Sequence, residues 1–174
     1  MRKRRILNVG CGEDTYGTHF IDLYPTRKEV LKCDVNKDKF PFPSNYFDEV
    51  IAIALFEHLT NPLNFLKESY RVLKKGGKLT IITDNAGFWG IFGKTHYGEY
   101  EKRRKKSGFE EDKHYALFTP NHLKNWLEYV GFRNIKIEYL VWKKYMKKEH
   151  YLFIKVLTLI SKRFYPHIKA EAIK

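Results

Sequence analysis

Residues 5–25 read RILNVGCGEDTYGTHFIDLYP and contain two apolar stretches separated by a short segment rich in glycine. The first stretch, Arg5–Gly10, runs into the turn Gly10–Gly12, and the second, His19–Leu23, contains Asp22 near its end. A buried strand, a glycine turn and an acidic residue at the next strand end predict an adenosine-type ligand at the carboxyl edge of a parallel sheet. The connection between the two strands is too short for the helix that normally joins such a pair.

A dinucleotide-binding motif is excluded by the same segment. The pattern Gly-x-Gly-x-x-Gly needs a third glycine at position 15, where this chain has Thr15. The acidic residue of that motif is also expected about 20 residues further on, well beyond Asp22.

Composition predicts a single soluble domain, residues 1–174, that can bury a sizeable core, because 43% of the residues are hydrophobic. The cysteines are Cys11 and Cys33, which imply no disulfide framework and favour a reducing, cytoplasmic location. No cysteine or histidine spacing indicates a metal site, so no metal is expected. The longest apolar run, Val50–Phe56, is too short to span a bilayer.

The formal charge of +13 has two explanations that both stay open. Runs of lysine and arginine, such as Lys102–Lys106 and Lys143–Lys148, can contact an anionic partner, for example nucleic acid, or form solvated faces. The chain lacks glutamine and is rich in lysine and glutamate, a bias that resembles proteins adapted to high temperature. We favour general surface charge over a nucleic-acid partner.

Strand and helix signals alternate along the chain, which predicts an α/β fold with a mostly parallel sheet. The predicted strands are Arg5–Gly10, His19–Leu23, Val30–Val35, Phe47–Ala54, Lys78–Asp84, Asn134–Leu140 and a short one at Ala170–Ile173. The predicted helices are Pro62–Lys74, Pro120–Val130 and Tyr151–Tyr165. In the first helix, an apolar stripe is expected to face the sheet; it comprises Leu63, Leu66, Tyr70 and Leu73.

The C-terminal amphipathic segment, residues 149–165, carries an apolar stripe with lysines on its other side. Such a helix suits the surface of an anionic membrane, but a stripe of this kind more often packs on the core or forms a dimer contact. We therefore expect core packing or a homodimer contact, with peripheral membrane binding as the alternative.

Several motifs follow the glycine turn in a fixed order. They read CDV at residues 33–35, FPFPSNYFD at 40–48, FEHL at 56–59 and RVLKKGGKL at 71–79. With NVGCG at 8–12, this ordered set resembles the class I S-adenosylmethionine-dependent methyltransferases over residues 6–140. The chain is similar to an abbreviated branch of that family, in which the first crossover helix is reduced or absent. The resemblance implies a Rossmann-like fold with antiparallel C-terminal strands and S-adenosylmethionine as the cofactor.

The resemblance also implies the role of each site residue. The glycine turn would lie under the methionine part of the cofactor, Asp22 would hold the ribose, and Asp34 with Val35 would frame the adenine. Phe56, Glu57 and His58 would face the transferred methyl group, which makes Glu57 and His58 the candidate catalytic residues. The complete set of expected cofactor contacts is Asn8, Gly10, Cys11, Gly12, Asp22, Leu23, Asp34, Val35 and Phe56.

Two residues depart from the family pattern. Asn8 stands where an acidic residue commonly approaches the ammonium group of the ligand, and Asp14 stands where a third small residue is usual. One alternative function is therefore a degenerate, non-catalytic binding module with the same fold. The other alternative, which the net charge suggests, is a nucleic-acid binding or modifying protein.

Residues 84–114 form a long connection that combines glycines, aromatic residues and a basic run. This composition suits a lid over the acceptor, and equally aromatic residues that cover an open sheet face. The methyl acceptor itself is unknown: a small or polymer-linked molecule, of negative charge if the basic run contacts it. Candidate bases are Glu57, His58, His96 and His114, and none of them is assigned.

Overall fold

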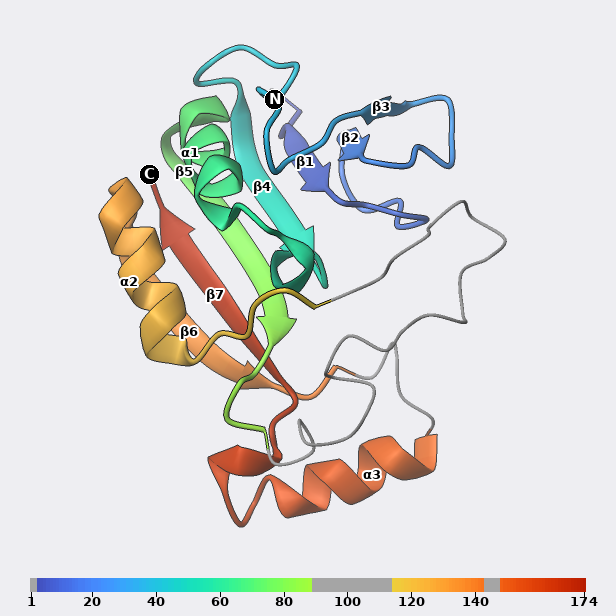
Figure 1. Cartoon of the computed structure of the whole chain (residues 1–174), viewed down its shortest axis with the longest axis vertical. Helices are drawn as coiled ribbons and strands as arrows, with labels where there is room; N and C mark the ends of the chain where they lie inside the picture. Colours follow the sequence, from blue (N-terminus) through green and yellow to red (C-terminus); the bar gives the residue numbers. More distant parts are fainter. Residues whose placement is uncertain (1–2, 89–113, 143–147) are drawn as a thin grey trace.

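The structure is a computed structural model and describes residues 3–88, 114–142 and 148–174. Its centre is a seven-stranded sheet with the order β3-β2-β1-β4-β5-β7-β6 (Figure 1). β7 is antiparallel to both of its neighbours, and the other pairs are parallel, which confirms the predicted fold class. The strands are β1 (Ile6–Val9), β2 (His19–Asp22), β3 (Val30–Lys32), β4 (Phe47–Ile53), β5 (Leu73–Asp84), β6 (Arg133–Leu140) and β7 (His167–Ile173).

Helix α1 (Pro62–Val72) begins where sequence predicts, because the Asn61 side chain accepts a hydrogen bond from the Asn64 N–H. It ends at Val72 rather than Lys74, since the extended backbone of Leu73 already belongs to β5. The predicted apolar stripe is confirmed in part: Leu66 is fully buried and Tyr70 packs half-buried against the core, whereas Leu63 is half-buried outside it. The buried residues of α1 are Phe65, Leu66, Ser69 and Val72.

Helix α2 (Pro120–Val130) matches its predicted bounds. The Thr119 side chain accepts from the His122 N–H at the start, and Gly131 adopts a left-handed conformation at the end. Leu123 and Leu127 are fully buried from this helix. In Figure 1 both α1 and α2 lie on the same face of the sheet.

No helix joins the first four strands within Gly10–Tyr46, all of which the structure describes. The reduced first crossover was predicted, but the second and third connections also lack helices. Only Gly10–Thr18 separates β1 from β2, and only Leu23–Glu29 separates β2 from β3. This half of the sheet therefore depends on hydrogen bonds within its loops rather than on covering helices.

The sheet face opposite α1 and α2 carries paired charges on its central strands. Glu49 of β4 pairs with Lys78 of β5 at 3.4 Å, and Lys78 pairs with Glu171 of β7 at 3.0 Å. Glu171 is also 2.9 Å from Lys169, and Arg4 lies 3.1 Å from Glu49. Buried parallel strands are normally apolar on both faces, so this ion-pair row marks a face that needs no helix to cover it.

Helix α3 (Lys148–Leu157) is followed by a separate 3-10 turn, Lys162–Phe164, so the segment predicted as one helix at 149–165 is interrupted. The helix has no buried residue, and Figure 1 shows it beyond the carboxyl ends of β4 and β5, away from α1 and α2. The expected core packing of this stripe is wrong. Most of its apolar residues are exposed, although Leu157 is half-buried; the exposed ones are Leu152, Phe153, Val156, Leu159 and Ile160.

No helix in the described ranges has the length and hydropathy needed to cross a membrane.

Candidate functional site

The turn after β1 has the backbone that a close ligand approach requires. Gly10 and Gly12 have φ values of 64° and 51°, in the left-handed region that side chains disfavour. The space beside Gly12 is open: a Cβ placed there would meet no atom within 4 Å. At Gly10 a Cβ would lie 2.7 Å from Cδ1 of Leu55, which places the β1 turn directly against the turn after β4.

Asp22 closes this turn from the end of β2. Its Oδ2 accepts from the Gly12 N–H and its Oδ1 from the Tyr24 N–H, each at 2.8 Å. The side chain is largely buried, so its orientation is fixed by the fold. A carboxylate oxygen accepts more than one hydrogen bond, so the same oxygens can also receive ribose hydroxyls. The residues present therefore fit the adenosine part of the expected cofactor.

Two side chains that sequence reasoning did not single out brace the shortened crossover. The hydroxyl of Thr26 donates to the Gly12 carbonyl at 2.8 Å, and Nη2 of Arg27 donates to the Asp14 carbonyl at 3.0 Å. The Arg27 guanidinium also lies over the ring of Phe20, 5.1 Å from its centroid. The loop between β2 and β3 thus does the bracing that a crossover helix would otherwise supply.

Asn8 and Asp14, the two departures from the family pattern, both act within the loop. The buried Asn8 amide donates to the Tyr16 carbonyl at 3.0 Å. The Asp14 carboxylate accepts from the Tyr16 N–H at 2.9 Å, which turns it back onto its own loop. Asp14 is therefore part of the turn that shapes this short connection. A direct contact between Asn8 and the cofactor stays a prediction.

Asp34 and Val35 follow β3 at the same carboxyl edge. Oδ1 of Asp34 accepts from the Asn36 N–H at 3.1 Å, and Lys37 lies 3.3 Å from Oδ2. The Val35 carbonyl accepts from the Asn64 side chain of α1 at 2.9 Å. These bonds fix the loop where the adenine is expected, and its contact with Asp34 and Val35 remains a prediction.

Two further predicted contacts differ in exposure. Cys11 is buried, and burial, together with the nearby Asp22 carboxylate, raises the pKa of its thiol to about 11. It therefore stays protonated at neutral pH and can contribute its backbone to the turn. Leu23 is 38% exposed at the end of β2, so its side chain is available to a ligand.

Phe56 belongs to the hydrophobic core. Its side chain is fully buried and packs against Phe118 and Phe65, with ring centroids 4.6 Å and 5.7 Å away. It anchors the 3-10 turn Phe56–His58 in the core, and a contact between Phe56 and the cofactor stays a prediction.

Glu57 is buried beside two groups from the end of β5. Its Oε2 accepts from the Thr83 hydroxyl at 2.7 Å. Burial, and then the neighbouring Asp84 carboxylate, raise the pKa of Glu57 to about 7. The side chain can therefore exchange a proton near neutral pH, which suits the candidate catalytic role.

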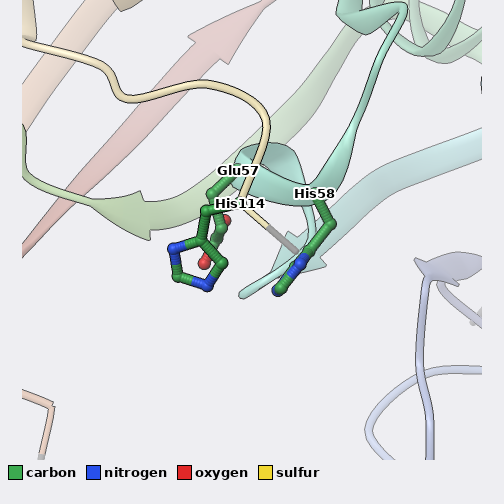
Figure 2. A group of neighbouring side chains, drawn as sticks. All are labelled: Glu57, His58 and His114. Carbon is green, nitrogen blue, oxygen red and sulfur yellow. The ribbon is translucent and has the colours of Figure 1, made fainter. Parts of the chain in front are cut away.

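His114 joins this cluster from a distant part of the sequence. Figure 2 shows the side chains of Glu57, His58 and His114 directed to the same side of the ribbon. The His58 and His114 rings are perpendicular, with centroids 4.6 Å apart. Nδ1 of His114 lies 3.2 Å from Oδ2 of Asp84. Sequence gave His114 as one of four candidate bases, and no spacing signal linked it to Glu57 and His58.

His96 and the other residues at 89–113 lie outside the described part of the chain, so the expected lid at 84–114 is described only at its two ends.

The sheet order, the glycine turn after β1, Asp22 at the end of β2 and Asp34 after β3 define the class I S-adenosylmethionine-dependent methyltransferases. The chain belongs to the methyltransferase domain family, whose model matches residues 2–137. It is a methyltransferase, and the cofactor of its class is S-adenosylmethionine.

Curated relatives share this similarity to different extents. An uncharacterized protein of Methanocaldococcus jannaschii is 31% identical over 154 residues, 82% of this chain and 71% of that protein. A chloroplastic 2-methyl-6-phytyl-1,4-hydroquinone methyltransferase of Oryza sativa is 28% identical over 64% of this chain. The chain spans 40% of the length of that rice enzyme.

Solved structures agree on the fold. A SAM-dependent methyltransferase from Archaeoglobus fulgidus has a TM-score of 0.65 and 20% identity, covering 98% of this chain and 86% of that one. A phosphoethanolamine N-methyltransferase of Haemonchus contortus, solved with S-adenosyl-L-methionine, has a TM-score of 0.61 and 18% identity. The similarity covers 98% of this chain and 48% of the Haemonchus chain.

Proposed function

We propose that this chain transfers a methyl group from S-adenosylmethionine, by direct displacement, to an acceptor held beside Glu57 and His58. One observation carries the proposal: the Gly10 turn and the turn after β4 are in contact through Leu55. A ligand seated on the first turn would therefore present its reactive end to the second. When bound, the cofactor supplies a methyl group on a sulfonium, which is already electrophilic.

The residues of this chain would contribute mainly positioning. Asp22 and the glycine turn would orient the cofactor, while the buried Glu57 would lie on the acceptor side. With its pKa near 7, Glu57 can accept a proton from an acceptor whose attacking atom carries one.

The acceptor we favour is a small or polymer-linked molecule of negative charge. The formal charge of +13 supports it, because a basic protein attracts anionic molecules. The same charge supports nucleic acid as the second candidate. Relatives include a 25S rRNA (adenine(645)-N(1))-methyltransferase of Schizosaccharomyces pombe, 30% identical over 65% of this chain. The third candidate is a non-catalytic binding module.

Label transfer distinguishes these three candidates. The protein would be incubated with S-adenosylmethionine carrying a tritiated methyl group and with separate RNA, lipid and small-molecule fractions of a cell extract. Label in a lipid or small-molecule fraction supports the favoured acceptor, and label in RNA supports the second candidate. Absence of transfer to every fraction would favour the binding module. Asp22→Ala is the control, because it removes the expected ribose contact.

We further propose a cytoplasmic location. It is supported by Cys11 and Cys33, which are both buried free thiols, as is usual in reducing compartments.

A further inference from the structure

Glu57, His58 and His114 bring three metal-ligand side chains together at the carboxyl edge of the sheet. One ligand atom from each lies within 4.8 Å of those of the other two. Figure 2 shows the carboxylate and both imidazoles directed into the same space. We propose that these three residues bind a divalent transition metal such as Zn²⁺ or Fe²⁺.

The backbone holds the three residues in place. The Glu57 carbonyl accepts from the N–H groups of Tyr115 and Ala116, at 2.9 Å and 3.2 Å. These bonds fix the segment that carries His114 beside the turn that carries Glu57 and His58. The cluster is therefore built from two chain segments joined by hydrogen bonds.

Polar groups from the end of β5 lie beside two of the three ligands. Nδ1 of His114 is 3.2 Å from the Asp84 carboxylate, which leaves Nε2 to face a metal. The Thr83 hydroxyl donates to Oε2 of Glu57 at 2.7 Å, which leaves Oε1. Metal-binding histidines commonly donate their other N–H to a carboxylate, and metal-binding carboxylates are commonly hydrogen-bonded in turn. The Glu57 carboxylate follows this pattern, and the Asp84 carboxylate lies at ion-pair distance from His114.

The donor set selects the metal. Two imidazoles and one carboxylate suit Zn²⁺ or Fe²⁺, whereas Mg²⁺ prefers oxygen ligands. Ligand atoms around one zinc ion are about 3.4 Å apart, given zinc–ligand bonds near 2.1 Å. The His58 side chain is half-buried, so we expect it to rotate and bring the three ligand atoms to this spacing when a metal binds. Three protein ligands leave a coordination position for water or a substrate, as in catalytic metal sites.

The use of that open position rests on the proposed function, but the metal would replace Glu57 in promoting loss of the acceptor's proton, because both Glu57 oxygens would then be engaged. An acceptor hydroxyl bound there would lose its proton more readily, as metal-bound water does. The acceptor oxygen would then bond to the methyl carbon while the carbon–sulfur bond breaks and its electron pair goes to sulfur. The products would be a methyl ether, S-adenosylhomocysteine and one proton. The site therefore favours an acceptor that methylates on oxygen.

Cobalt absorption tests the site in the whole chain. Co²⁺ alone would be titrated into protein cleared of metal by a chelator, and its visible absorption bands recorded. We expect the intense bands of a four- or five-coordinate ion, abolished by competing Zn²⁺ and unaffected by millimolar Mg²⁺. His114→Ala and Glu57→Gln should each weaken Co²⁺ binding at least tenfold, and Asp84→Asn about tenfold.

A matched control excludes binding to surface histidines. His122 is exposed on α2, outside the cluster, so His122→Ala should leave the Co²⁺ affinity within twofold of the unaltered protein. Circular dichroism would establish that each variant is folded, and the native protein should also unfold at a higher temperature with Zn²⁺ than without it. The metal site would be overturned if the absorption bands were no stronger than those of hydrated Co²⁺. It would also be overturned if folded His114→Ala bound Co²⁺ with unchanged affinity.

Failure of the metal site and failure of the proposed function give different results. The metal-free protein should still bind S-adenosylhomocysteine in a calorimeter, since Asp22 and the glycine turn lie outside the cluster. If this cofactor product binds but Co²⁺ does not, the metal proposal alone is wrong. If Co²⁺ binds but neither S-adenosylhomocysteine nor S-adenosylmethionine does, the proposed function is wrong.

Discussion

The backbone N–H of Gly12 donates a hydrogen bond to Oδ2 of Asp22 at 2.8 Å, across the shortened connection between β1 and β2. This bond joins the two features that first indicate a nucleotide site, the glycine turn and the acidic strand end. Thr26 and Arg27 brace the same turn from the next loop. The pocket edge is therefore preformed without the helix that usually supports it.

Replacing Gly10 should destabilise the fold more than replacing Gly76. Both glycines have a positive φ, 64° and 77°, but a Cβ at Gly10 would meet Leu55 at 2.7 Å and one at Gly76 would meet nothing. We expect Gly76→Ala to lower the free energy of unfolding by about 1 kcal/mol, and Gly10→Ala by about 2 kcal/mol. Urea denaturation measures both, and equal losses would contradict the Leu55 contact.

Arg71→Lys should also destabilise the protein. The Arg71 guanidinium donates to the Phe42 carbonyl at 2.9 Å and the Phe40 carbonyl at 3.0 Å, and it pairs with Glu68. A lysine ammonium group cannot make these hydrogen bonds to two carbonyls and a carboxylate at once. We therefore expect the free energy of unfolding to fall by about 2 kcal/mol. The exposed Arg133 offers a control: Arg133→Lys should change stability by less than about 0.5 kcal/mol. An unchanged denaturation midpoint in Arg71→Lys would show that the hydrogen bonds of the Arg71 guanidinium do not stabilise the fold.

The thiols of Cys11 and Cys33 should react slowly in the folded protein. Burial raises the pKa of Cys11 to about 11 and that of Cys33 to about 12, so the reactive thiolate is scarce at pH 8. Both thiol pKa values lie above pH 9. The rate of reaction with iodoacetamide should therefore rise about tenfold per pH unit between pH 7 and 9. In urea the same rate should be far higher and begin to level near pH 8.5. Rapid modification of the folded protein at pH 7 would contradict the burial of both thiols.

The exposed apolar face of α3 should bind anionic membranes. Phe153 and Val156 are 60% and 62% exposed on a helix that also carries lysines, a pattern typical of interfacial helices. The double variant Phe153→Ser with Val156→Ser should lose binding to phosphatidylglycerol vesicles in a sedimentation assay. Tyr129→Ser is the matched control, because Tyr129 is 72% exposed on α2. If the unaltered protein does not bind these vesicles and light scattering shows a dimer, this face of α3 is a contact between two copies of the chain instead.

Local patterns predicted most of the fold. The caps at Asn61 and Thr119 gave the starts of α1 and α2, because such signals depend on neighbouring residues alone. The charged sheet face was not predicted. Glu49, Lys78 and Glu171 come from three strands far apart in the sequence, and their pairing depends on strand register.

The candidate site was predictable on its cofactor side and less so on its acceptor side. Gly12 and Asp22 lie ten residues apart, so one motif contains both. His114 follows His58 by more than fifty residues, and it reaches Glu57 only through hydrogen bonds between the two segments. The exposure of α3 was also missed, since an apolar stripe does not specify what covers it.

Calorimetric titration of S-adenosylhomocysteine into the whole chain and into Asp22→Ala tests the methyltransferase site most directly. We predict saturable one-to-one binding by the unaltered protein and an affinity at least tenfold weaker in Asp22→Ala, which loses the expected ribose contact. Thermal unfolding would establish that the variant is folded. Absence of binding by the unaltered protein at millimolar ligand, or equal affinity in folded Asp22→Ala, would contradict the site described here.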